Sequence, residues 1–456
     1  MQSAPSMSPL FLGMLRRRKV SAGCIAPLSR FLGAVKVSSA LQCRYQHQHS
    51  FIKSRTVHVP IRANGSVQLN ILEPENEGKS STGDVLLYMT PGPLFGFEQA
   101  NSTRQILKQT SLQADDTFQR SLVESTSATV VTVHYRLGPM AQGIEGGEST
   151  EKEIRFFQFP TPIHDALAAF DWVNENLHPR TLGTVGARIG GALAVMLALT
   201  EPRKITATAT ISPITNWADL DNWCINKHTE NEKSFDEGQL ENAISPSELV
   251  PLLSTRERLF QIPCHYFSPF ASPLLFLRSA GVVAPRSMPR YNTGPAFPIP
   301  KYRPPPKEEL EAMTEGELDD LLYQKIDLPA DSQRVVLSQP FYKVVGRYTR
   351  WTGLGPPVDE KDLLRAVQGP RSILPYTRIY SHQTKTAPLL ASQGKLLARA
   401  MELSCFGRHE KGTASERVQV EYLPEGHDIW KFDDQTLARS ISQFFIDAIE
   451  QRPQLD

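Results

Sequence analysis

The chain has no aspartate or glutamate before Glu73, although residues 1–55 carry nine lysines and arginines. An N-terminus that lacks acids and is rich in Arg and Ser is typical of a mitochondrial transit peptide. We therefore expect residues 1–50 to be a transit peptide or a disordered basic tail, and the protein to act in mitochondria, in the matrix. The overall formal charge is only +1, so the remainder of the chain is net acidic. Nucleic acid is therefore not expected as its general partner.

Long apolar runs are also missing, so we expect no integral membrane span. The five cysteines show no CxxC motif and no metal-ligand spacing, which predicts reduced thiols, no disulfide framework and no zinc site. A Rossmann fingerprint is absent, and no glycine-rich stretch has the regular spacing of a phosphate loop. The sequence thus gives no reason to expect a cofactor or a metal.

Strand-like and helix-like segments alternate along most of the chain. The first pair of strands surrounds Asn64-Gly65, a dipeptide that favours a tight hairpin turn. Further strands are expected over 84–90, 128–136, 205–214, 377–381 and 418–424, and helices over 161–177, 394–403 and 435–451. Strands that alternate with helices predict a mostly parallel sheet covered on both faces, here with an antiparallel start.

Two segments interrupt this alternation. Residues 215–265 have the polar, Trp-containing composition of a cap. Residues 281–372 form a longer insertion with eight prolines between Pro285 and Pro306. This proline density predicts an extended surface segment without regular helix or sheet. An acidic helix is expected at 306–325. Basic and aromatic residues are interleaved at 286–306 and again at 342–351, so the region 281–350 could dock on an acidic protein partner or on RNA.

Six segments resemble, in their order, the α/β-hydrolase fold and are most similar to its hormone-sensitive-lipase-like esterase and lipase branch: "VVTVHYRLGP", "FPTPIHDALAAFDWV", "GARIGG", "ISPI", "FSPFASPLL" and "PEGHDIW". The resemblance implies a mostly parallel central sheet flanked by helices, with a cap and a long Pro-rich insertion. It places the first part of the hydrolase domain at 51–280, with the cap at 215–265, and its C-terminal part at 373–456. The insertion at 281–372 has no counterpart in this resemblance.

The resemblance also implies a catalytic serine on a sharp strand-to-helix turn with the pattern G-x-S-x-G. Here the turn reads "TVGARIGG": Gly186, Gly190 and Gly191 are kept, and Arg188 stands at the serine position. A guanidinium stays protonated and is no nucleophile at neutral pH. We expect the turn to be retained and Arg188 to point into the former catalytic pocket.

The other catalytic elements that the resemblance implies are also incomplete. The oxyanion loop after the strand at 84–90 reads Thr90-Pro-Gly-Pro, so Gly92 is its only remaining glycine. Proline has no N–H to donate to an oxyanion. Residues 381–395, which follow the strand at 377–381, contain no Asp or Glu, and Ala387 occupies the place of the triad acid. Only His427 matches a triad position.

Two functions remain open from the sequence. The first is a pseudoenzyme, a non-hydrolytic binding or scaffold protein in mitochondria, with a small anionic ligand held by Arg188. The alternative is an enzyme of a small-molecule pathway, acting on a secondary metabolite or a lipid with His427 as general base. Such an enzyme would be an esterase-like hydrolase of carboxylic esters or a lyase-like catalyst. Loss of nucleophile and acid together favours the first function.

Overall fold

The computed structural model describes residues 52–61, 65–75, 83–94, 116–142, 153–224, 247–278, 288–294, 296–303, 374–385, 387–406, 411–424 and 435–451. All of them belong to one compact unit, His49–Asp456. The expected transit peptide, the acidic helix at 306–325 and His427 lie outside the described residues.

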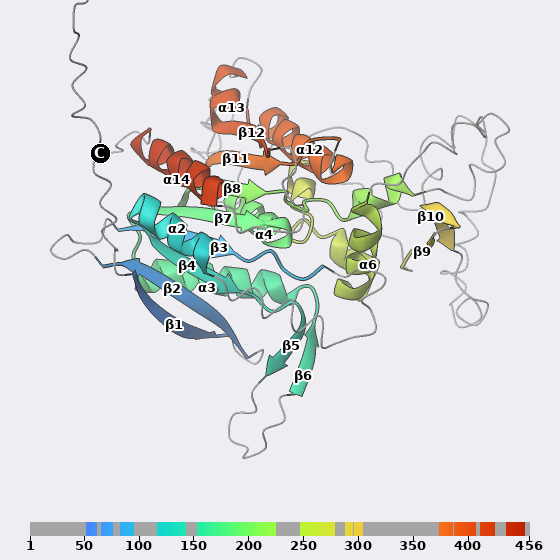
Figure 1. Ribbon diagram of the computed structural model, residues 1–456, viewed down its shortest axis with the longest axis horizontal. Helices are drawn as coiled ribbons and strands as arrows, with labels where there is room; N and C mark the ends of the chain where they lie inside the picture. Colours follow the sequence, from blue (N-terminus) through green and yellow to red (C-terminus); the bar gives the residue numbers. More distant parts are fainter. Residues whose placement is uncertain are drawn as a thin grey trace, which may run out of the picture. The chain divides into compact units, whose positions relative to one another are not determined.

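A sheet of eight strands forms the centre of this unit (Figure 1), in the order β1-β2-β4-β3-β7-β8-β11-β12. Its strands are β1 (Ile52–Pro60), β2 (Ser66–Pro74), β3 (Asp84–Met89), β4 (Thr129–His134), β7 (Thr181–Ala187), β8 (Ile205–Ile211), β11 (Tyr376–Ser381) and β12 (Val418–Tyr422). β2 pairs antiparallel with both β1 and β4, and every other pair in this sheet is parallel. The predicted mostly parallel sheet with an antiparallel start is confirmed.

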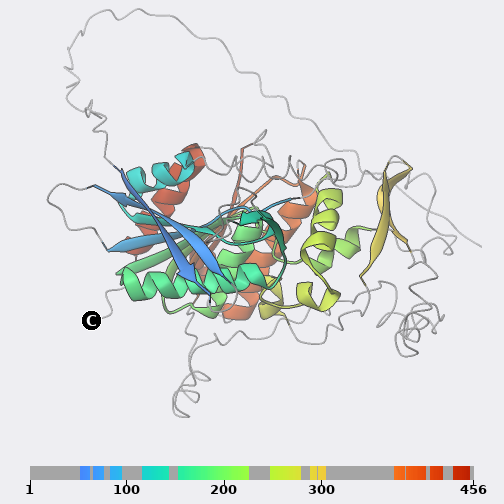
Figure 2. The same ribbon diagram turned by 90° about the horizontal axis from the view of Figure 1, so that it is seen from below.

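Helices cover both faces of the sheet. Figure 2 shows α2 (Thr117–Thr126) and α14 (Gln435–Glu450) on one side and α3 (Thr161–Asn176) on the other. The second side also holds α4 (Arg188–Thr200) and α12 (Pro388–Cys405). Successive residues of β3 alternate between these faces, since Leu87 packs with α3 and α4 whereas Leu86 packs with α2 and α14. Burial on both faces explains why the central strands are apolar throughout.

The described residues between β8 and Arg278, a segment that we call the cap, form mainly short helices: η3 (Ala218–Trp223), α6 (Leu249–Leu259), α7 (Pro263–Tyr266) and η5 (Pro273–Leu277). Its core is aromatic. The ring of Phe260 stacks on Phe159 at a centroid distance of 4.5 Å and meets the edges of Trp217 and Tyr266. Phe159 directly precedes α3, so this stack fastens the cap to the sheet unit.

Several elements were not expected from the sequence, among them α2 and three small elements described next. The strands β5 (Gly138–Gln142) and β6 (Glu153–Phe157) pair as an antiparallel hairpin. A short helix, α13 (Lys411–Arg417), precedes β12. Within the ranges given above, no helix combines the length and the apolar character needed to cross a membrane.

The prediction that the Pro-rich segment lacks regular structure is wrong for its central part. β9 (Arg290–Gly294) and β10 (Phe297–Arg303) form an antiparallel pair. Proline interrupts a strand because it has no N–H for the ladder, and it is tolerated at bulges and edges. Pro298 and Pro300 fall in such a place, because the register shifts between Phe297 and Lys301.

Candidate functional site

A sharp turn joins β7 to α4 at the position where the family resemblance implies a catalytic serine and the sequence has Arg188. Ala187 ends β7 in an extended conformation, and Arg188 begins α4 with a φ of +50°. A positive φ is uncommon for a residue with a long side chain and signals a backbone held by its surroundings. This strand, turn and helix have the geometry of a nucleophile elbow.

The glycines of the turn allow three backbone segments to approach one another. A Cβ atom on Gly186 would collide with the carbonyl group of Gly190. A Cβ atom on Gly190 would in turn collide with the carbonyl oxygens of Met89 and Thr90 at the end of β3. At Gly191 the added carbon would lie 3.1 Å from the Cβ of Pro213, which is tight. The first two positions therefore accept only glycine.

The strand order and this turn together decide the architecture. The fold is that of the α/β hydrolases. In the serine hydrolases of this fold the characteristic turn carries the nucleophilic serine, and here it carries Arg188. The flanking residues Ala187 and Ile189 offer neither a hydroxyl nor a thiol.

Arg188 is buried, with 7% of its surface exposed. Its charge acts on two tyrosines: Tyr88 of β3 and Tyr135, which directly follows β4. Burial raises the pKa of Tyr88 and of Tyr135, and the positive charge of Arg188 partly opposes the rise for each. The guanidinium group therefore lies near the carboxyl ends of β3 and β4. The first turn of α4 adds the positive end of a helix dipole at the same place.

The oxyanion loop runs past this cation. Gly92 has a φ of +75°, and an added Cβ atom would lie 2.6 Å from the hydroxyl oxygen of Tyr135. That hydroxyl donates to the carbonyl oxygen of Thr90 at 2.7 Å. The loop is thus held close to Tyr135 at a position where only glycine fits. Tyr88 and Tyr135 were not singled out from the sequence, because each reads there as an ordinary aromatic residue of a buried strand.

The place of the triad acid is occupied by a fully buried alanine. Ala387 precedes α12 as its N-cap residue. A carboxylate reaches this helix end from the cap: Oε1 of Glu248 accepts a hydrogen bond from the backbone N–H of Leu389 at 3.0 Å. Burial raises the pKa of Glu248, while backbone hydrogen bonds, including those from Leu389 and Leu390, lower it. Glu248 thus caps the amino end of α12, although it lies 141 residues before Leu389 in the sequence. No local sequence pattern predicts this contact.

His427, the one triad position that the sequence matches, lies outside the described residues. The structure therefore brings together Arg188, Gly92 and the turn glycines, and gives no geometry for the histidine. Within the described ranges, no cluster of three His, Cys, Asp or Glu side chains could bind a metal ion.

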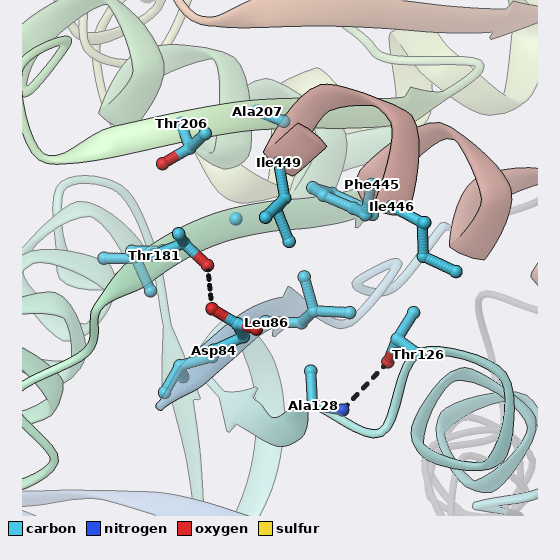
Figure 3. Close-up of a pocket in the computed structure, with 13 residues that line it drawn as sticks. Asp84, Leu86, Thr126, Ala128, Thr181, Thr206, Ala207, Phe445, Ile446 and Ile449 are labelled. Carbon is cyan, nitrogen blue, oxygen red and sulfur yellow. Dashed lines mark hydrogen bonds between the residues drawn. The ribbon is translucent and has the colours of Figure 1, made fainter. Parts of the chain in front are cut away.

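A small pocket lies elsewhere on the molecule, at the amino ends of the strands (Figure 3). Asp84 and Thr181, the first residues of β3 and β7, line it together with Phe445 of α14. Arg188 follows the opposite end of β7, so this pocket is distinct from the turn. It encloses about 20 Å³, enough for about one water molecule. Asp84 also forms an ion pair with Arg180 at 3.0 Å.

No protein-family model matches the chain, and no curated protein sequence is similar to it. Solved structures do match. They include carboxyl esterase 2 of the fungus Tuber melanosporum, with 12% identity, a TM-score of 0.43 and 89% of each chain covered. The esterase LipW of Mycobacterium marinum has 14% identity and a TM-score of 0.43, over 87% of this chain and 82% of LipW.

A third match is brefeldin A esterase, described as a bacterial homologue of human hormone-sensitive lipase. It has 13% identity and a TM-score of 0.41, with 89% of this chain and 80% of that one covered. At these values the similarities add nothing to what the strand order and the turn establish about the fold.

Proposed function

We propose that this protein uses an α/β-hydrolase fold to bind a small anionic ligand without hydrolysing esters. The observation that carries the proposal is the side chain at the elbow. Ester hydrolysis by this fold needs a nucleophile that forms an acyl intermediate. Arg188 cannot form one, because its guanidinium group stays protonated and presents only hydrogen-bond donors.

The surroundings of Arg188 favour a carboxylate or a phosphate as the ligand. The cation is buried, and electrostatic attraction is stronger away from water. The amino end of α4 and a planar guanidinium group both favour an anion, the second through paired hydrogen bonds. The hydroxyl groups of Tyr88 and Tyr135 lie within the electrostatic reach of Arg188. The ligand class is therefore a small mono- or dianion.

The proposal is tested with the purified full-length protein. A fluorophosphonate probe should not label it, and p-nitrophenyl acetate should not be turned over above background. Inorganic phosphate and acetate, titrated by calorimetry, are the binding probes. Arg188→Ala should weaken their binding by about 1.5–3 kcal/mol, the cost of a lost charged hydrogen bond. The control is Arg203→Ala, at an exposed position beyond α4, which should leave the affinity unchanged.

Arg188→Ser separates this proposal from the enzymatic alternative. The serine would stand on an intact turn, but the acid position would still hold Ala387, and Pro91 and Pro93 would still flank Gly92. We expect no esterase activity from this variant, because a serine without the triad acid restores little of the catalytic rate of a complete triad. Turnover of a short-chain ester by the native protein, abolished by His427→Ala, would reject the binding function in favour of the enzyme.

The site of action that we propose is the mitochondrion. The acid-free, basic N-terminus supports it. A fusion of residues 1–60 to a fluorescent protein should enter mitochondria in cultured cells. The matched control replaces Arg16, Arg17 and Arg18 by glutamine, which removes a third of the basic charge of residues 1–55 and should impair import. A native fusion that stays diffuse in the cytosol would exclude this localisation.

A further inference from the structure

A buried carboxylate joins the cap to the C-terminal part of the sheet unit. Glu248 is the N-cap residue of α6 and is fully buried. Its Oε1 accepts the hydrogen bond from the backbone N–H of Leu389, in the first turn of α12, and its Oε2 accepts one from the hydroxyl group of Ser247 at 3.4 Å. One carboxylate therefore lies at the amino ends of two helices, α6 and α12.

The part of the chain that the structure describes provides no cation for this carboxylate. The first turns of α6 and α12, residues 249–255 and 388–394, contain no ionisable side chain. η3, which packs against α6, carries Asp219 and Asp221, and these acids face Arg278 and Arg256. The groups that lower the pKa of Glu248 are all neutral: backbone N–H groups and the Ser247 hydroxyl.

Burying a carboxylate away from a cation is costly. Hydrogen bonds from neutral donors and the positive ends of two helix dipoles offset part of this cost. Burial nevertheless has the largest effect, and the pKa of Glu248 is raised above its ordinary value of 4.5. The ionised carboxylate therefore weakens the contact between α6 and α12 in which it takes part.

α6 lies close to the elbow. The backbone N–H of Ile214 donates to the carbonyl oxygen of Arg188 at 3.1 Å. Three residues later, the carbonyl oxygen of Trp217 accepts a hydrogen bond from Nη1 of Arg256 on α6 at 3.0 Å. Figure 1 and Figure 2 both show α6 beyond the carboxyl ends of the central strands, the side on which β7 leads into α4. A movement of α6 would therefore change the access of a ligand to Arg188.

The two ends of α6 are held by different interactions. At the carboxyl end, the ring of Phe260 stacks on Phe159, and the backbone N–H of Phe159 donates to the carbonyl oxygen of Leu259 at 3.0 Å. At the amino end, the carboxylate of Glu248 joins the helix to α12. Packing thus fixes one end, and a buried charge holds the other. This arrangement suits a helix that pivots about its carboxyl end.

We infer that α6 is a gate over the Arg188 site and that Glu248 is its charge-sensitive latch. The gating of ligand entry rests on the binding function proposed above, whereas the motion of α6 does not. In the closed form the carboxylate is buried against α12. In the open form the amino end of α6 has left α12, and water solvates the carboxylate. Ionisation of Glu248 therefore favours the open form, and a proton on Glu248 favours the closed one.

The direction of the pH dependence follows from linkage. The raised pKa means that the closed form binds the proton of Glu248 more tightly than the open form, whose solvated carboxyl has the ordinary value of 4.5. The full stability of the closed form is present below pH 4.5. It is lost as the pH rises through the raised pKa, and above that pKa it stays constant.

Hydrogen exchange of the full-length protein tests the latch. Glu248→Gln keeps an oxygen that accepts from Leu389 and removes the charge. At pH 8, the amides of residues 249–255 and 389–392 should exchange more slowly in this variant than in the native protein, by about tenfold for each unit by which the pKa is raised. The difference should be smaller at pH 5. The matched control is Glu175→Gln, at an exposed position of α3, which should exchange like the native protein.

Equal or faster exchange in Glu248→Gln, or an unfolded variant by circular dichroism, would show that the charge holds α6 in place and would overturn the inference. Association of inorganic phosphate, followed by tryptophan fluorescence at pH 8, tests the gate. Phosphate should associate more slowly with Glu248→Gln than with the native protein, and equal rates would overturn the gate. If the native protein binds no phosphate, the anion site is rejected and the gate over it with it, whereas the exchange rates still decide the latch.

Discussion

Gly190, in the first turn of α4, lies against the carbonyl oxygen of Thr90 at the end of β3, with no room between them for a methyl group. This contact sets the distance between the elbow and the oxyanion loop. Gly190→Ala would place its Cβ atom well inside van der Waals contact of backbone atoms, which cannot rotate away as a side chain can. We expect a loss of about 3 kcal/mol or more in the free energy of unfolding.

Chemical denaturation measures this loss. Gly412→Ala is the control, because a Cβ atom at this position of α13 would meet nothing within 4 Å. Alanine is the better helix former, so this variant should be neutral or slightly stabilised. Similar stabilities for the two variants would show that the elbow tolerates a Cβ atom and that its glycines are not required for the turn.

A buried ion pair links Arg136, two residues after the end of β4, to Asp165 of α3. The carboxylate of Asp165, which is fully buried, accepts hydrogen bonds from Arg136: from its backbone N at 2.7 Å, from Nε at 3.0 Å and from Nη2 at 2.6 Å. Asp165→Asn should cost about 3–5 kcal/mol, because it leaves a buried guanidinium group without its carboxylate. The half-exposed pair of Arg55 and Glu73 provides the comparison. Glu73→Gln should lower the free energy of unfolding by less than about 1 kcal/mol. Urea titrations of both variants and of the native protein measure the two losses.

The central sheet could be predicted from the sequence because each of its strands carries its own signal. The segment around β3 is short and apolar, and those around β4 and β8 are rich in β-branched residues. The turn at Gly65 has a φ of +83° that suits the Asn-Gly dipeptide. The elbow could be predicted because its glycines, Gly186, Gly190 and Gly191, lie within six consecutive residues of the sequence. The hairpin β9–β10 was missed because proline density predicts the absence of a strand unless a bulge and a tertiary contact accommodate it.

The environment of the candidate site depends on contacts between distant parts of the chain. Tyr88 and Tyr135 lie near Arg188 only after β3, β4 and β7 pair side by side. Glu248 reaches α12 from the cap. A single sequence carries no periodic signal for such pairings, so residue types at these positions cannot be distinguished from ordinary core or loop residues.

His134 gives the protein a predictable pH dependence. It ends β4, and burial lowers its pKa below the ordinary value of 6.5. Between the lowered pKa of the folded protein and 6.5, the unfolded chain binds more protons than the folded one, so stability rises with pH. Its contribution is present above about pH 6.5 and is lost as the pH falls through the folded-state pKa.

His134→Gln should remove this contribution. The stability of the native protein relative to that of the variant should therefore increase from pH 5 to pH 7, measured by urea unfolding at each pH. His164→Gln, on the exposed side of α3, is the control for the loss of a histidine. A constant difference between native and His134→Gln proteins across this range would contradict a buried neutral imidazole at the end of β4.

The last prediction concerns the anchor of the β9–β10 hairpin. Tyr291→Phe keeps the ring on the core but removes the hydroxyl group that donates to Asp221. Oδ1 of Asp221 keeps its bond from Arg256, and the loss should cost about 1–3 kcal/mol in local stability. Trypsin should then cut at Arg290 or Lys301 several times faster than in the native protein, because local opening precedes cleavage. Tyr302→Phe, for which the described residues provide no such hydroxyl contact, is the matched control. Equal cleavage rates for both variants would show that ring packing alone holds the hairpin on the cap.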